Sequence, residues 1–188
     1  MTNQQVVVTE KQRDFDFIHL GLVPKIVDDE RSQIFFDNEK AWDYLMGEAK
    51  LFLEKIPEEY KIGLEEKLRK EDMVGEFVAL DTPHDFRFGF SPGYRLLMGN
   101  SDINCSQFYL DFVPTNEDEA TGIIKSALDQ FHLHLPYGPG NMLALEVKDK
   151  KPVIEGTDFL DKYLDEGTKV EIRCNLYLGN ATRTHVVK

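Results

Sequence analysis

Residues 108–113, Phe-Tyr-Leu-Asp-Phe-Val, indicate the fold class, because apolar and polar side chains alternate along the segment. Successive side chains of a β-strand point to opposite faces of the sheet. The pattern therefore predicts a strand that presents its apolar residues to a core and places Tyr109 and Asp111 on the opposite face. We expect Asp111 to point away from the apolar face.

Residues 116–131, directly downstream, predict the clearest amphipathic helix of the chain. Apolar residues recur there at three- and four-residue steps, which is the period of an α-helix. Three consecutive acids, Glu117, Asp118 and Glu119, stand at its start. Their negative charge suits the positive end of a helix dipole.

Residues 38–70, upstream of the strand, predict a helical front half. Apolar side chains recur with a helical period as far as Ile56, and Pro57 is expected to end or bend that helix. Residues 58–70 predict a second helix, which Gly63 weakens by about 1 kcal/mol relative to alanine.

Residues 76–178 predict a sheet-rich remainder with a short helix at 157–165. Segments rich in aromatic and β-branched residues, separated by Pro, Gly and Asn turn signals, are typical of strands. We expect these strands at 76–80, 86–90, 107–113, 142–147 and 169–178. A chain of 188 residues suits a single core. The sequence therefore predicts one α+β domain with a mostly antiparallel sheet over residues 1–188, of which residues 1–12 are expected to fray.

The charge of the chain favours a cationic partner. It carries 34 acidic and 22 basic residues, for a net charge of −12. Between Leu96 and Val147 the only Lys or Arg is Lys125, against seven acids. Such a surface attracts positively charged partners and repels phosphate backbones. We therefore expect a basic protein as the partner, and no nucleic acid.

The chain is predicted to be cytoplasmic and to have no membrane partner. Its first residues lack the apolar core of a secretory signal, and no apolar run approaches the length of a membrane span. Cys105 and Cys174 form no CxxC pair, which argues against zinc and redox motifs. We expect no cofactor.

The sequence contains no recognisable catalytic motif, so the candidate site is a contact surface. The residues predicted to bind a partner are Tyr109, Asp111, Glu117, Asp118 and Glu119. Acids there would meet cationic groups, and Tyr109 would act as an aromatic anchor beside Asp111.

His132 and His134 support the alternative of a small metal-dependent enzyme or metal-binding protein. Their two-residue spacing places both imidazoles on one face if the segment is a strand. The helix predicted through residue 131 instead places them at a helix end, so we interpret both as structural and expect no bound metal. A phage or other structural assembly protein is a further alternative.

Three segments, in order along the chain, resemble motifs of the SMI1/KNR4 family, also called SUKH. The first is Phe52-Leu-Glu-Lys-Ile-Pro-Glu-Glu-Tyr60, which is similar to the family's helix and Leu-Pro-x-x-Tyr junction. The second is Asp111-Phe-Val-Pro114 with the later Gly122-Ile-Ile124. The third is residues 151–164, which resemble the closing strand and helix.

The resemblance implies an α+β domain with a strongly bent sheet and flanking helices, and a role in binding proteins rather than in catalysis. Bacterial members of the family are typically immunity proteins that neutralise toxins, often nucleases, while fungal members act in cell-wall regulation. The resemblance also implies a strand around Ile123, where periodicity predicts a helix, and both alternatives stand for residues 119–125.

Overall fold

The computed structural model of the protein describes residues 18–25, 38–98, 101–135, 145–148, 151–154, 160–176 and 179–188. Side chains are described for residues 18–25, 39–92, 108–133, 160–172 and 184–188. Cys105, Cys174 and His134 lie in strands, but their side chains are outside this set.

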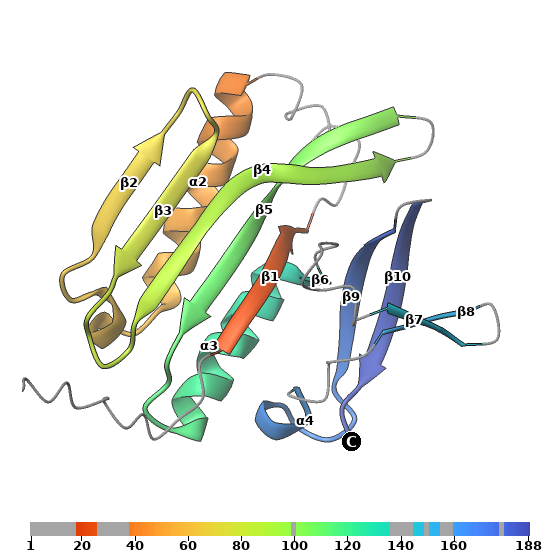
Figure 1. Cartoon of the computed structure of the whole chain (residues 1–188). Coiled ribbons are helices and arrows are strands. Elements are labelled where there is room, and N and C mark those ends of the chain that lie inside the picture. The colour runs from red at the N-terminus through yellow and green to blue at the C-terminus, as the bar shows by residue number, and fades with distance from the viewer. Residues whose placement is uncertain are drawn as a thin grey trace, which may run out of the picture.

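The described part of the chain forms an α+β fold around a mostly antiparallel sheet of eight strands (Figure 1). The order of the strands across the sheet is β10-β9-β6-β1-β5-β4-β3-β2. Among the described strands, β6 and β9 are the one pair that runs in parallel. The eight strands are β1 (Ile18–Pro24), β2 (Glu65–Arg69), β3 (Val74–Ala79), β4 (Phe86–Met98), β5 (Ser101–Phe112), β6 (Phe131–Leu135), β9 (Lys169–Leu176) and β10 (Gly179–Val186). A separate hairpin pairs β7 (Leu145–Lys148) with β8 (Lys151–Ile154).

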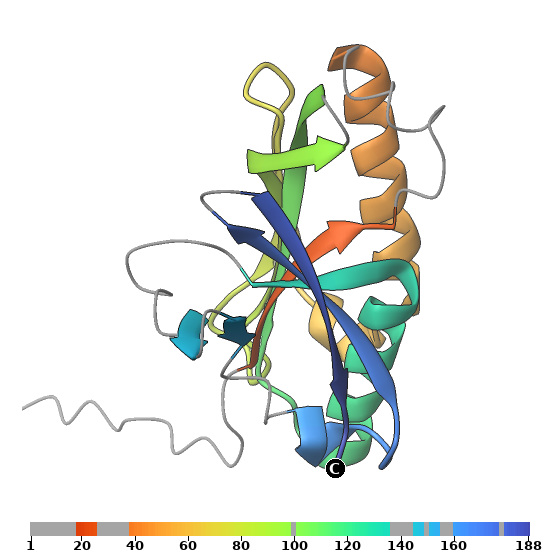
Figure 2. The same ribbon diagram turned by 90° about the vertical axis from the view of Figure 1, so that its right-hand side faces the viewer.

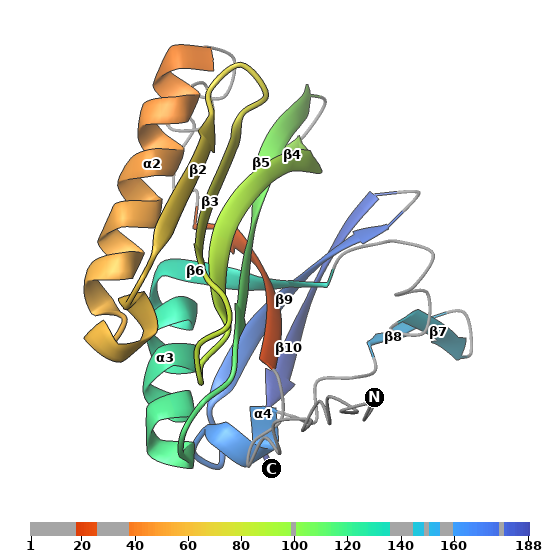
Figure 3. The ribbon, with the colours of Figure 1, turned by 60° about the vertical axis from the view of Figure 1, so that its left-hand side comes forward.

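Two helices, α2 (Asn38–Lys55) and α3 (Glu117–Gln130), lie on the same side of this sheet (Figures 2 and 3). The described helices are completed by the 3-10 turn η1 (Glu58–Lys61) and by α4 (Leu160–Tyr163). We call the covered side the helix face, and the opposite side, which carries His19, Arg87, Tyr109 and Asp111, the second face. No helix in the described parts of the chain combines the length and the apolar character needed to cross a membrane.

The helix face is packed with aromatic side chains. Phe88 of β4 lies 4.6 Å from Phe52 of α2 and 5.6 Å from Phe108 of β5, measured between ring centroids. Phe131 of β6 lies 4.9 Å from Phe108. All four rings are fully buried. One cluster thus joins α2 to three strands from the middle part of the sheet, β4, β5 and β6, which fixes the helix on the sheet.

The sheet is strongly curved. In the strand order, β4 and β10 are separated by the four strands β5, β1, β6 and β9. Strand β4 nevertheless contacts both β9 and β10. Seen from two directions, the far ends of the β4–β5 hairpin and of the β9–β10 hairpin both turn away from α2 and α3 (Figures 1 and 3). The second face is therefore on the inside of this curve.

The alternation in residues 108–113 predicts the central strand correctly. Phe108, Leu110 and Phe112 are fully buried on the helix face. Tyr109 and Asp111 are partly exposed on the other side, as predicted. The amphipathic helix is also confirmed as α3, which settles residues 119–125 as helix where the family resemblance implies a strand.

The prediction that residues 38–70 are all helical is wrong beyond Lys55. Residues 58–61 form one 3-10 turn, and Glu65–Arg69 form strand β2 at the edge of the sheet. The physical cause lies at Gly63, whose φ of 71° belongs to the left-handed region that favours glycine. A residue in that conformation ends a helix and turns the chain, here into β2.

The boundaries of other elements also differ from the predictions. His132 and His134 lie inside strand β6 and not at a helix end. Of the predicted helix at 157–165, Leu160–Tyr163 form the helical turn α4, and residues 157–159 lie outside the described residues. Residues 142–144 of the predicted strand 142–147 are also outside them, and the strand observed there is β7.

Candidate functional site

Asp111 lies in a row of polar residues across the second face. Strand pairing places it directly opposite His19 of β1 on one side and Arg87 of β4 on the other. The Arg87 side chain is half-buried, and its Nε atom is buried without a hydrogen-bond partner among the described residues. The row brings one carboxylate, one imidazole and one guanidinium together on three neighbouring strands.

The His19 imidazole and the Asp111 carboxylate form a hydrogen bond through Nδ1 of the ring. This hydrogen bond raises the pKa of His19 above its ordinary value, with the charge of Asp111 adding to it and partial burial opposing both. The His19 side chain is 57% exposed, while that of Asp111 is 15% exposed. The second ring nitrogen, Nε2, is therefore the one left to contact a partner or to exchange a proton.

Tyr109 lies in the next row of the second face. Its hydroxyl donates to the Glu76 carboxylate at 2.7 Å. Burial, and next this hydrogen bond, raise the pKa of the Tyr109 phenol. The ring lies against Gly89, where an added Cβ would stand 2.7 Å from the tyrosine hydroxyl oxygen. Glycine at position 89 thus makes room for the aromatic ring on the sheet.

The first turn of α3 carries the three acids predicted to bind a partner, and they differ in availability. Asn116 caps the helix by accepting a hydrogen bond from the Glu119 backbone N–H at 2.9 Å. The Glu119 carboxylate in turn accepts from the Thr115 backbone N–H and hydroxyl, so it is tied into the cap. Glu117 and Asp118 are exposed.

Buried contacts join this turn to two other connecting segments. The Val113 backbone N–H donates to the His84 carbonyl at 2.6 Å. The ring centroids of His84 and Tyr60 lie 4.1 Å apart. Burial, and next the charge of Glu119, raise the pKa of the Tyr60 phenol. Residues 58–61, 80–85 and 113–119 therefore meet at one end of the sheet.

We call these three segments the acidic end. Their sequences contain seven acids and a single lysine or arginine, Lys61. Lys61 itself binds Glu58 at 2.6 Å. The exposed acids of this end are Glu58, Glu59, Asp81, Glu117 and Asp118.

The described carboxylates of the cation-poor stretch 96–147 lie on more than one surface. Asp111 is turned to the second face and engaged by His19, while Glu117 and Asp118 lie at the acidic end. Asp129 lies near the other end of α3, and the side chains of Asp102 and Glu146 are outside the described set. Four of the seven acids of the acidic end come from segments 58–61 and 80–85, which lie outside the stretch 96–147.

Nothing among the described residues supports the alternative of a metal site at His132 and His134. The His132 imidazole lies 3.4 Å from the Glu171 carboxylate, and the side chain of His134 is not described. Among the described side chains, no group of three or more His, Cys, Asp or Glu could hold a metal ion.

Compared with known proteins, the chain matches no family model, no curated protein and no solved structure. Membership of the SUKH family therefore stays a prediction from the three motifs.

Sequence reasoning missed His19 and Arg87, which flank Asp111. A signal for His19 was present, because Ile18, Leu20 and Leu22 alternate in the manner of a strand and place His19 on the polar face. Arg87 lies in a predicted strand, but only the pairing of β4 with β5 places it opposite Asp111.

Proposed function

We propose that the protein is an acidic binding module that docks its acidic end onto a basic protein. The observation that supports this most directly is that three separate segments, which together carry seven acids and only one lysine or arginine, Lys61, meet through Tyr60, His84 and Val113. Buried contacts of the backbone and of aromatic side chains hold these acid-rich segments together. A cationic partner would lower the electrostatic energy of this concentration of negative charge.

Glu117 and Asp118 are the strongest contact candidates at this end. Both are exposed and stand in the first turn of α3, where the positive end of the helix dipole stabilises their negative charge. The field of these exposed charges increases the rate at which an oppositely charged partner arrives.

The second face provides contacts of another kind beside the acidic end. Asp111 precedes the acidic segment 113–119 by two residues, and His19 presents its free ring edge next to it. Tyr109 adds an amphipathic ring to this surface. The charged acidic end would then attract the partner, and the polar second face would supply orientation.

The partner that fits best is a toxin domain that grips nucleic acid, so that the protein acts as an immunity-type inhibitor. A protein that binds nucleic acid is basic, and an acidic inhibitor mimics the phosphates at its site. The resemblance to SUKH motifs points to the same class, since bacterial members of that family typically neutralise toxins.

A matched pair of charge-reversal variants tests the proposal. Glu117→Lys with Asp118→Lys changes the acidic end, and Glu65→Lys with Glu66→Lys changes two exposed acids of the edge strand β2. Both variants have the same net charge, so a general effect of charge would affect them equally. The wild type and each variant are used to capture binding proteins from the native cell, and the captured proteins are identified by mass spectrometry. The rate at which a captured partner associates is then measured at several salt concentrations.

We expect the wild type and the β2 variant to retain a basic protein that the acidic-end variant loses. The association rate should fall as salt rises, because screening shortens the reach of the exposed charges. Equal retention by the two variants, or an association rate that does not change with salt, would contradict the proposal.

A further inference from the structure

A cavity of about 320 Å³ lies at the other end of α3, away from the acidic end. The C-terminal half of α3, the start of β6 and the turn between α4 and β9 form its walls. Its lining includes four apolar side chains, Leu128, Phe131, Leu164 and Val170. Phe131, Leu164 and Val170 are also buried members of the core, so this lining is backed by packed structure. A volume of this size is at the lower end of those that hold small molecules.

Three lysines from different elements converge on this cavity. Lys125, the only cation of the stretch 96–147, comes from α3, Lys25 follows β1, and Lys169 begins β9. The lining carries these three lysines against two carboxylates, whereas the whole chain has a net charge of −12. Even with Asp165, which pairs with Lys125, the lysines and carboxylates here balance, so this site lacks the acidic excess of the chain.

Contacts within the chain hold two of these ammonium groups in place. Lys25 donates to the carbonyl oxygens of Leu128 and Asp129, at 2.7 and 3.1 Å, in the last turn of α3. The Lys125 ammonium lies 2.9 Å from the Asp165 carboxylate. Lys169 is exposed, and no described residue forms an ion pair with it.

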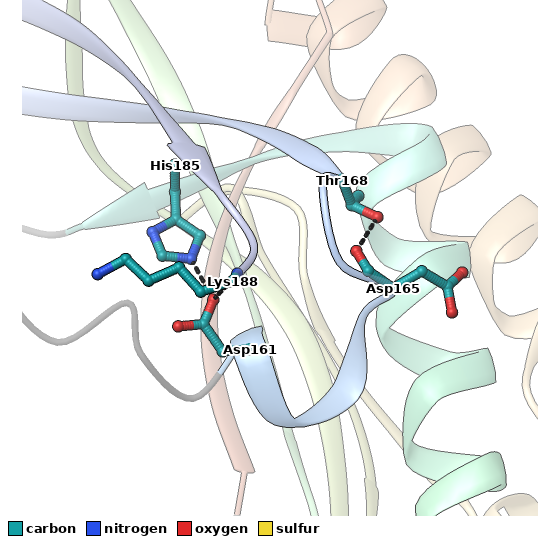
Figure 4. Close-up of polar contacts among 5 residues, drawn as sticks. All are labelled: Asp161, Asp165, Thr168, His185 and Lys188. Carbon is teal, nitrogen blue, oxygen red and sulfur yellow. Dashed lines mark hydrogen bonds and ion pairs between the residues drawn. The ribbon is translucent and has the colours of Figure 1, made fainter.

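The turn that presents Lys169 is fixed by hydrogen bonds (Figure 4). The Thr168 hydroxyl donates to the Asp165 carbonyl at 2.6 Å, and Gly167 adopts a φ of 82° that few other residues tolerate. Behind the turn, Asp161 accepts from His185 at 2.8 Å and from the Lys188 backbone N–H at 3.1 Å. This wall of the cavity therefore needs little reorganisation to bind a ligand.

We propose that this cavity binds a small organic anion, with its apolar body against the Phe131 and Val170 side and its anionic group at Lys125 and Lys169. An apolar lining with a few convergent charged groups is the usual composition of a small-molecule site. An ammonium group gives a charge-assisted hydrogen bond to a carboxylate, sulfonate or phosphate. This inference is independent of the proposed docking function, because the residues involved are separate.

Anilinonaphthalene sulfonate, a fluorescent aromatic anion, is a suitable probe, and phenylnaphthylamine is its neutral counterpart. Fluorescence titration of the full chain should show saturable binding of one sulfonate probe per chain and clearly weaker binding of the neutral amine. Lys125→Met with Lys169→Met should weaken sulfonate binding about tenfold, since two charge-assisted contacts are lost while the apolar stems remain.

Lys50→Met with Lys67→Met, both exposed and outside the cavity, provides the control with the same change of net charge. Thermal melts of the two variants confirm that each is folded. Equal affinity of the two double variants for the sulfonate, absence of saturation, or equal affinity of the wild type for the neutral amine would each overturn the proposal.

Discussion

Different interactions stabilise the two faces of the sheet, and β5 contributes side chains to both. On the helix face, Phe108, Leu110 and Phe112 are fully buried among aromatic rings. On the second face, the alternate residues Tyr109 and Asp111 form hydrogen bonds with side chains of neighbouring strands and keep partial contact with solvent. One strand can therefore fix the fold through the side chains on one of its faces, while the side chains on its other face stay available for recognition.

Removing a ring from the helix face should have the largest effect. Phe88→Ala deletes a fully buried ring that contacts Phe52 and Phe108, and we expect the free energy of unfolding to fall by about 3–5 kcal/mol. Urea titration followed by circular dichroism measures the change. A loss of only about 0.5–1.5 kcal/mol, the size expected for a hydrogen bond of the second face, would erase the distinction between the faces.

Gly89 links the two faces, because it supports Tyr109 on the second face from within β4. In Gly89→Ala the added Cβ would stand 2.4 Å from the Gly75 carbonyl oxygen and 2.7 Å from the Tyr109 hydroxyl oxygen. We expect a loss of about 1–3 kcal/mol in the free energy of unfolding, since backbone must move to relieve the contact. Gly122→Ala is the control, because its Cβ meets no atom within 4 Å. Equal stabilities of the two variants would show that position 89 tolerates a side chain.

The sequence predicts the parts of the fold in which one face of an element is buried. In residues 108–113 and in α3, apolar side chains face the core and polar side chains face solvent, so the sequence pattern shows the period of each element. The structure confirms both elements. Strand β2 has no such division, because Glu65–Arg69 are exposed on both faces and are held by backbone pairing with β3. Nothing in the order of its side chains distinguishes it from a solvent-exposed helix.

The candidate site was less predictable because it depends on contacts between distant segments. Sequence identifies Asp111 as a residue of the polar face, but its hydrogen bond to His19 joins residues 92 positions apart. The acidic end depends on the contact between Tyr60 and His84, which no local pattern predicts. Sequence proximity did group Glu117, Asp118 and Glu119, yet it could not show that Glu119 is engaged by Thr115.

A smaller effect is expected from the second face itself. Tyr109→Phe removes the hydroxyl that donates to Glu76, and we expect the free energy of unfolding to fall by about 0.5–1.5 kcal/mol. Glu76→Gln and the double variant complete a cycle that isolates the pair, because the effects of the single changes should not add. Additive effects would show that the hydrogen bond contributes nothing to stability.

The hydrogen bond between His19 and Asp111 should have the smallest effect on stability and a distinct dependence on pH. The pKa of His19 is raised in the folded protein, so proton binding favours the folded state. That contribution is complete below the ordinary pKa of 6.5 and is lost as the pH rises through the raised value. The imidazole is 57% exposed, so solvent screening should keep the contribution below about 1 kcal/mol.

Nuclear magnetic resonance titration of the His19 ring measures this effect more directly than unfolding does. In the wild type the midpoint should lie above 6.5, and in Asp111→Asn it should fall, because the variant removes the charge and weakens the hydrogen bond that raise the pKa. The difference in stability between the two proteins should also shrink as the pH rises past the wild-type midpoint. An unchanged midpoint in Asp111→Asn would mean that the hydrogen bond does not govern His19. The second face would then lack the preorganised imidazole that its proposed role in orienting a partner requires.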